Sequence, residues 1–248
     1  PTIKDIIHLK ANDELLLDSE IHWYVNGEEI SERSNNTMFF YYELKKGDVI
    51  QAIVVKENKK FPSNEIIIAN SPPMIKRAIM KPESPHVGSV LEVDAEAYDP
   101  DGDEVSFDYK WFINDSLFGE ESSIYEGFKR GDKISVEVIP KDGDSYGKSV
   151  TLSKIIENAP PIVIEGRGGV NGEFYEYHIN AHDPDGDELV YKLEEAPEDM
   201  TIDKDGVIKW KIDQDDYGTH NIKVNISDGH GGYVLYAIDV NINPPVTP

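Results

Sequence analysis

The sequence contains no cysteine in its 248 residues, which excludes disulfides, thiolate zinc sites and thiol catalysis. Basic residues are scarce: 24 Lys and Arg stand against 48 Asp and Glu, and the formal net charge is -24 at pH 7. Nucleic acid and an anionic lipid surface would both repel this chain, so neither is expected as its main partner. The excess of acids favours cations as partners, or serves solubility alone.

Long apolar runs are also missing. No run approaches the roughly 18 residues that a membrane helix needs, so we expect no segment that spans a bilayer. The chain begins at Pro1 without the basic and apolar regions of a signal peptide, and we expect a mature chain or a piece of a longer protein. Helical periodicity is lacking as well, whereas 39% hydrophobic residues are enough to build packed cores.

Proline pairs divide the chain into three parts. Pro72-Pro73, Pro160-Pro161 and Pro244-Pro245 each follow an apolar stretch that is typical of a last strand. The intervals between these pairs suit a domain of about seven short strands. Because proline stiffens a connection, the pairs are interpreted as linkers. The predicted domains are residues 1–71, 72–158 and 159–248.

Alternating apolar residues predict strands in each part. Leu91, Val93, Ala95 and Ala97 would share one face of a strand, and the run from Tyr175 to Ala181 repeats the pattern. Turn signals such as "KKGD", "KRGD" and "DKDG" separate the strand-like runs. This organisation predicts an all-β fold of three tandem Ig-like or cadherin-like β-sandwich domains.

The first two parts match one another. "IHWYVNGEE" with "LKKGDVIQAIVV" in the first part parallels "YKWFINDSL" with "FKRGDKISVEVI" in the second. Trp23 and Trp111 take equivalent places, which predicts that each packs between two sheets. The first part is shorter before its tryptophan. It is therefore expected to lack an early strand and to expose an edge that another strand can complete.

Two acidic turns place three carboxylates at alternate positions. They are Asp99, Asp101 and Asp103 in "AYDPDGDEVSF", and Asp183, Asp185 and Asp187 in "AHDPDGDELVY". Proline, glycine and Asp form turns without any ligand, so structural Asx-turns are one explanation. Acids in one loop repel one another by about 1 kcal/mol per close pair, however, and a hard cation such as Ca2+ would remove that repulsion. The position of the glycine and the flanking strands exclude an EF-hand.

The third part carries a longer series of motifs. After its acidic turn come a hairpin with a glycine turn, the segment "IDQD", the Asp-Gly turn in "SDGHGG" and a last strand before "NPP". Over residues 158–243 this order resembles the cadherin-like family, including its bacterial relatives. The second part shares only the acidic turn, a "KDGD" turn and the linker, and it resembles a bacterial Ig-like or PKD-like module.

The resemblance implies calcium sites at the junctions between domains, with ligands from the linker, the acidic turn and a later Asp. One implied site uses Asp183, Asp185, Asp187 and Asp228, with Glu157 or Asn158 from the linker. The other uses Asp99, Asp101, Asp103, and Asp142 or Asp144, with Asn70 from the linker. Both linkers are poorer in acids than those of the family, which predicts a smaller set of ligands.

The sequence offers little for catalysis. Motifs of metalloproteases, α/β-hydrolases and P-loop proteins are lacking, and the seven histidines have no ligand spacing, so we expect no enzyme. The glycine-rich "EGRGGVNGE" opens no helix and is interpreted as a flexible connection between strands.

These observations predict an extracellular structural or interaction protein, exported to a prokaryotic cell surface. It would be a calcium-stiffened rod that serves as a stalk, an adhesin or a filament subunit, and that self-associates by strand completion. The alternative is a carbohydrate- or surface-binding region of a larger exported enzyme. Its platform for a cell-surface glycan would consist of Tyr125, Tyr146, Tyr217 and Tyr233.

Overall fold

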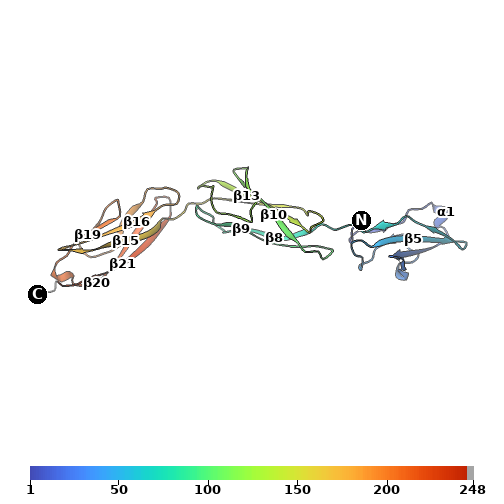
Figure 1. Cartoon of the computed structure of the whole chain (residues 1–248), viewed down its shortest axis with the longest axis horizontal. Helices are drawn as coiled ribbons and strands as arrows, with labels where there is room; N and C mark the ends of the chain where they lie inside the picture. The colour runs from blue at the N-terminus through green and yellow to red at the C-terminus, as the bar shows by residue number, and fades with distance from the viewer. Residues whose placement is uncertain (245–248) are drawn as a thin grey trace. The chain divides into compact units, whose positions relative to one another are not determined.

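The computed structural model describes residues 1–244, so Pro245 of the third proline pair lies outside the described residues. Apart from one helical turn, α1 (Asp13–Leu16), and two 3-10 turns, η1 (Ser31–Arg33) and η2 (Gln214–Asp216), the regular elements of this range are strands (Figure 1). The predicted all-β class is therefore confirmed. We call strands β1–β7, β8–β14 and β15–β21 the first, second and third sandwich.

Contacts between residues group the chain into two compact units. The first unit comprises Pro1–Ile79, Val93–Lys110 and Val136–Leu152, and the second unit holds the other described residues. The first sandwich thus lies wholly in the first unit and the third sandwich wholly in the second. Each unit also contains part of the second sandwich, and each of the two acidic turns lies within a single unit.

In the first sandwich one sheet is very small. Its two strands, β1 (Ile7–His8) and β4 (Met38–Phe39), pair over two residues each. The second sheet is larger and is built around β5, which pairs with β2, β6 and β7. Its strands are β2 (Glu20–Val25), β3 (Glu28–Glu29), β5 (Val49–Lys56), β6 (Lys59–Pro62) and β7 (Ile66–Ile67). The short stretch before the strand of Trp23 thus contributes one strand of two residues, whereas longer strands precede the strand of Trp111 in the second part of the chain.

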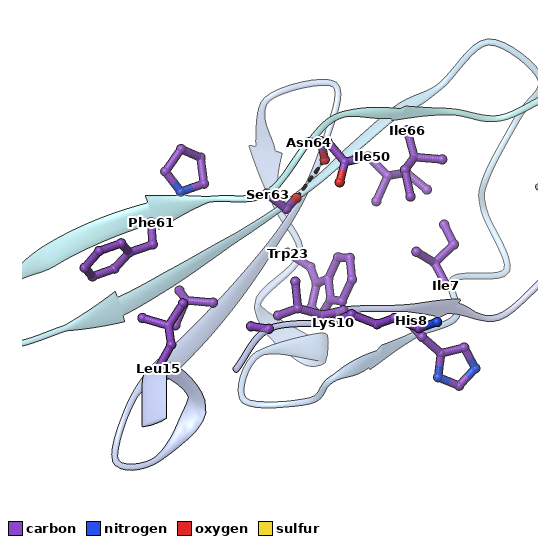
Figure 2. Close-up of a pocket in the computed structure, with 14 residues that line it drawn as sticks. Ile7, His8, Lys10, Leu15, Trp23, Ile50, Phe61, Ser63, Asn64 and Ile66 are labelled. Atoms are coloured by element: carbon purple, nitrogen blue, oxygen red, sulfur yellow. Dashed lines mark hydrogen bonds between the residues drawn. The ribbon is translucent and has the colours of Figure 1, made fainter. Parts of the chain in front are cut away.

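Trp23 forms the centre of the first core. Its side chain is buried and stacks on Phe39 with ring centroids 4.9 Å apart, and its Nε1 donates a hydrogen bond of 2.8 Å to the Asn36 carbonyl. A pocket of about 340 Å³ lies beside it, and Figure 2 shows Ile7, Ile50 and Phe61 among the side chains that line it. The small sheet therefore leaves an open seam next to the core tryptophan.

The second sandwich has two sheets of four and three strands. The first has the order β11 (Ser116–Gly119), β10 (Ser106–Ile113), β13 (Lys133–Lys141) and β14 (Val150–Ile155). The other has the order β12 (Ser123–Ile124), β9 (Leu91–Tyr98) and β8 (Met74–Lys81). Trp111 is fully buried on β10, and its Nε1 donates to the Glu121 carbonyl at 2.9 Å. Trp111 and Trp23 thus occupy the equivalent buried places that the matching motifs predict.

The third sandwich is the most regular, and Figure 1 shows its strands in yellow to red. One sheet has the order β15 (Ile162–Asn171), β16 (Phe174–His182), β19 (Val207–Lys211) and β18 (Thr201–Ile202). The other has the order β17 (Val190–Glu195), β20 (Gly218–Ser227) and β21 (Tyr233–Ile242). Tyr175, Ile179 and Trp210 from the first sheet share one core cluster with Ile222 and Val240 from the second.

The glycine-rich segment corrects one expectation. "EGRGGVNGE" is not a flexible connection, because most of it lies in β15, which pairs with β16 along its length. A Cβ atom on Gly168 would lie 2.1 Å from the backbone oxygen of Glu176, whereas one on Gly169 would meet open space. Gly168 is therefore required by the close approach of the neighbouring strand, a reason that composition does not reveal.

Candidate metal centres at two linkers

The second acidic turn, Asp183 to Asp187, begins directly after β16 and is organised by its first carboxylate. Asp183 Oδ1 accepts hydrogen bonds from the backbone N–H of Asp185 at 2.8 Å and of Asp187 at 3.4 Å. In the first acidic turn, Asp99 to Asp103, the corresponding distances are 2.7 and 3.4 Å. Each turn is thus a local Asx arrangement, which leaves the second oxygen of its first Asp free for another partner.

Each turn also gathers its three acids. Asp99, Asp101 and Asp103 each offer an oxygen within 4.8 Å of the other two, and the same holds for Asp183, Asp185 and Asp187. Asp183 Oδ2, Asp185 Oδ1 and Asp99 Oδ2 are buried and have no hydrogen-bond partner. The side chain of Asp185 is only 2% exposed. Burying a charged oxygen without a partner is costly, and a hard cation is a partner that carboxylates accept.

The second linker contacts this turn through Asn158 and Ala159. The Ala159 N–H donates to Asp185 Oδ2 at 2.8 Å, and Asn158 Nδ2 donates to Asp228 Oδ2 at 2.6 Å. Asp228 is 3% exposed and also accepts from the backbone N–H of His230 and Gly232. Desolvation acts to raise the pKa of Asp228, but these hydrogen bonds outweigh it and hold that pKa below its ordinary value.

The first linker makes the same contacts. The Ser71 N–H donates to Asp101 Oδ2 at 2.6 Å, and Asn70 Nδ2 donates to Asp142 Oδ2 at 2.8 Å. Desolvation acts to raise the pKa of Asp142, but hydrogen bonds from Asn70, Ser145 and the amide of Asp144 lower it to about 2. Asp142 therefore occupies the place that Asp228 has in the third sandwich.

Two predicted ligands are not among the gathered acids, although Asp144 shares Lys46 with Asp103. The backbone of Glu157 pairs with the segment Pro85–His86, to which it donates an N–H at 2.7 Å, and its side chain is exposed. Asp144 is 63% exposed and accepts a hydrogen bond of 2.9 Å from Lys46. At the second linker Asn158, rather than Glu157, is thus the residue whose side chain reaches the acids.

Two basic residues that were not among the predicted site residues complete the sites. Arg130 contacts both oxygens of Asp187, with Nη2 3.0 Å from Oδ1, and Nη1 also donates to Asn158 Oδ1. Lys46 makes an ion pair with Asp103 and donates to Asn70 Oδ1 at 2.9 Å. Each linker therefore has the same pattern, in which a cation joins the linker Asn to the third Asp of the acidic turn.

The "KKGD" and "KRGD" turns position these cations. The Gly131 N–H donates to the Ile156 carbonyl at 2.8 Å, and the Gly47 N–H donates to the Ile68 carbonyl at 2.9 Å. Their φ angles of +87° and +89° favour glycine. Because Ile68 and Ile156 precede the linker asparagines by two residues, the basic residue before each glycine is held beside the linker. The repetition of "KKGD" and "KRGD" in the sequence is the signal that could have pointed to Lys46 and Arg130, although it was taken only as evidence of turns.

The ion pair at the second linker is reflected in the titration of both partners. The Arg130 guanidinium lowers the pKa of the Asp187 carboxyl, and Asp187 in turn raises the pKa of Arg130. His230 also approaches, with Nδ1 3.2 Å from Asp187 Oδ2. The acidic turn thus already has one resident positive charge.

Two tyrosines of the expected sugar platform lie far apart. Tyr125 and Tyr146 of the second sandwich are 63% and 65% exposed. In the third sandwich Tyr217 directly precedes β20, whereas Tyr233 pairs with Ser227 at the other end of that strand. The ten residues of β20 separate these two rings by roughly 30 Å. Tyr217 and Tyr233 therefore belong to different parts of the surface.

The family comparison concerns the third sandwich. Residues 158–241 match the model of a family described as a bacterial Ig domain. The expected resemblance to Ig-like or cadherin-like repeat domains is thereby confirmed, and the family that matches is the Ig-like one; the matched segment begins at the linker residue Asn158. A comparison with curated proteins found no match. Within the described residues, no helix is long and apolar enough to cross a membrane.

Solved structures of tandem domains are similar to this chain at low identity and with low TM-scores. A structure of Sidekick-1 immunoglobulin domains 1-5 is 14% identical with a TM-score of 0.30, over 96% of this chain and 57% of that one. A structure of Drosophila OTK extracellular domains 3-5 is 11% identical with a TM-score of 0.36, and the match covers 97% of this chain and 91% of that one. The human desmocollin-1 ectodomain is 16% identical with a TM-score of 0.30, and the match covers 92% of this chain and 52% of that one. The chain thus spans little more than half the length of the first and third of these structures.

Proposed function

We propose that this chain is a non-catalytic structural module of a prokaryotic cell surface, in which Ca2+ binds at the linkers and stiffens them. The observation that carries the proposal is the pair of buried oxygens without partners, Asp183 Oδ2 and Asp185 Oδ1, next to the second linker. Asp183, Asp185 and Asp187 would hold the ion there, and Asp99, Asp101 and Asp103 are the corresponding acids at the first linker. A bound ion would supply positive charge that draws the acids together.

Stiffening follows from which residues the acids already contact. Asp185 accepts a hydrogen bond from the backbone of Ala159, and Asp228 holds the side chain of Asn158. An ion that orders the acidic turn therefore also restricts the backbone of the linker beside it. Loss of freedom in a short linker is what would make a series of sandwiches act as a stalk.

The test is thermal unfolding of the whole chain with a chelator and with millimolar Ca2+. Calcium should raise the melting temperature, because an ion that binds only the folded state stabilises it. Asp183→Ala with Asp185→Ala should remove most of this increase, and the milder Asp185→Asn should reduce it. Glu194→Gln with Glu198→Gln changes the charge of the same sandwich by the same amount at exposed positions and should leave the increase intact. Identical melting curves with and without calcium would refute the proposal.

We further propose residues 1–71, 72–158 and 159–248 as the folding domains. Within residues 1–244 each sheet draws its strands from one sandwich, and the third sandwich has a core cluster of its own. A fragment of residues 158–248 should therefore unfold cooperatively by itself. A fragment without a cooperative transition would contradict this boundary.

Self-association through the first sandwich is a second candidate function. The supporting observation is the open seam beside Trp23, where β1 and β4 pair over only two residues. A strand from another copy could complete this sheet. Sedimentation and electron microscopy should then show polymers that strengthen with salt, since the charge of -24 makes copies repel one another.

Phe61 provides the matched variant for this candidate. It lines the pocket and is 40% exposed, whereas Phe118 in the second sandwich is 44% exposed. Phe61→Asp should abolish association and Phe118→Asp should not. A chain that remains monomeric at high concentration and high salt would exclude this candidate. We favour both structural roles over glycan binding, because Tyr217 and Tyr233 lie at opposite ends of β20.

A further inference from the structure

Each linker is closed by a cation that belongs to the preceding sandwich. Arg130 contacts Asp187 and Asn158, and Lys46 contacts Asp103 and Asn70. The two basic residues come from equivalent turns, "KRGD" and "KKGD", and each turn is hydrogen bonded to the strand that leads into its linker. The same arrangement thus occurs twice with different basic residues, which is evidence for a repeated device rather than one accidental side-chain placement.

The carboxylate that each cation contacts is also one of the three acids of the candidate metal centre. Both oxygens of Asp187 face Arg130, while Asp183 Oδ2 and Asp185 Oδ1 remain unpartnered. Arg130 Nη1 is also 3.8 Å from Asp185 Oδ2. A divalent ion that used all three acids would share Asp187 with a guanidinium, and like charges so close together repel.

We infer that Lys46 and Arg130 are resident cations that close the two linkers without metal, and that Ca2+ must compete with them for Asp103 and Asp187. This inference rests on the proposed calcium binding and concerns its regulation. The linkers then have two closed states, one held by the basic side chain and one held by the ion. Calcium would bind more weakly than the number of acids suggests, because one of the acids is already neutralised.

The experiment measures calcium binding to the whole chain by calorimetry, for the unchanged protein and for Arg130→Gln. Removing the guanidinium should tighten binding at the second linker by about tenfold, since it removes one positive charge next to the ion. Arg167→Gln is the matched control, because this arginine is 79% exposed on the third sandwich and pairs only locally with Glu165. Arg130→Lys keeps the charge and should bind calcium nearly as the unchanged protein does.

The same comparison applies to the first linker. Lys46→Gln should tighten calcium binding there, whereas Lys211→Gln, at an exposed position paired with Phe174 at the end of β16 opposite the acidic turn, should have no effect. Circular dichroism at room temperature checks that each variant is folded before binding is measured.

The possible results separate this inference from the proposed function. Competition at this site is supported if Arg130→Gln binds calcium more tightly and Arg167→Gln binds it as the unchanged protein does. The tighter binding by Arg130→Gln should also disappear when Asp183→Ala and Asp185→Ala are added to it. Equal or weaker binding by Arg130→Gln overturns the inference and leaves the proposed calcium function in place. No calcium binding by the unchanged protein or by any variant overturns both.

Discussion

Ala159 donates its backbone N–H to Asp185 Oδ2 at 2.8 Å, and its methyl side chain offers no donor to the other oxygen of that carboxylate. At the first linker, Ser71 takes the same place but uses both its N–H and its hydroxyl, and the hydroxyl lies 3.2 Å from Asp101 Oδ1. The Ser71 hydroxyl, which Ala159 lacks, thus decides whether the second Asp of each turn keeps an unpartnered oxygen.

This difference predicts unequal calcium sites. Ser71→Ala should tighten binding at the first linker, and Ala159→Ser should weaken it at the second, each by roughly fivefold, the equivalent of about one hydrogen bond. Calorimetric titration of both variants checks this. Ser19→Ala is a suitable control, since it removes a hydroxyl that donates to the Leu16 carbonyl at 2.9 Å, before β2 in the first sandwich. Opposite shifts, or none, would contradict the role of the hydroxyl.

Asn158 should matter for stability even without metal. Asn158→Ala removes the donor to Asp228, which is 3% exposed, and should lower the free energy of unfolding in chelator by about 1–3 kcal/mol. Asn221→Ala removes an exposed Asn–Asp hydrogen bond of 2.7 Å to Asp239 and should cost less than about 1 kcal/mol. Chemical denaturation of both variants gives the comparison. Equal losses of stability in the two variants would show that the buried contact at the linker contributes no more than the exposed one.

His22 should make the first sandwich more stable in mild acid. Its Nδ1 lies 2.7 Å from Glu29 Oε1, and this hydrogen bond raises the pKa of His22 although burial opposes it. Because the pKa of His22 is higher in the folded protein than in the unfolded chain, protonation of the ring stabilises the fold. This contribution is complete below the unfolded pKa of 6.5 and is lost as the pH rises through the folded pKa. His22→Gln should therefore destabilise more at about pH 5.5 than at about pH 9.

Denaturant unfolding at the two pH values checks this prediction. Glu29→Gln should reduce the same pH dependence, because it removes the nearer carboxylate, whereas Glu20 Oε2 remains 3.5 Å from Nε2 of the ring. A His22→Gln effect that is the same at both pH values would show that the ion pair does not contribute.

The glycines of β15 predict a sharp contrast between neighbours. Gly168→Ala would place a Cβ 2.1 Å from the backbone oxygen of Glu176 and should cost about 1–3 kcal/mol of stability. Gly169→Ala meets open space and should change stability by less than about 0.5 kcal/mol. Melting temperatures of the two variants are enough for the test. Similar melting of both would mean that β15 can move away from β16.

Local signals in the sequence were sufficient for the strands and the acidic turns. Alternation predicted that Tyr175 and Ile179 face the core, and the Asp-x-Asp spacing predicted which acids gather. The proline pairs also located the linkers, where Asn70 and Asn158 proved to contact the later acids Asp142 and Asp228. These features depend on residues that are close in sequence or on motifs whose order is itself informative.

Long-range contacts were harder to predict. Arg130 and Asp187 are far apart in sequence, and the repeated "KKGD" and "KRGD" turns single out the basic residue without indicating which acid it meets. The close approach of β15 to β16 at Gly168 is likewise a property of the paired strands and not of a glycine-rich composition. Both depend on how separate segments are brought together, which a single sequence without homologues does not show.

The hydrogen bonds at the second linker have a mechanical consequence. Tension along the backbone would pass through residues 156 to 159, where the Ile156 N–H is bonded to Asp132 and the Ala159 N–H to Asp185. The Arg130–Asp187 ion pair connects the same two turns outside the covalent chain. Part of a pulling force would therefore bypass the proline pair, and the linker would resist extension until that bypass breaks.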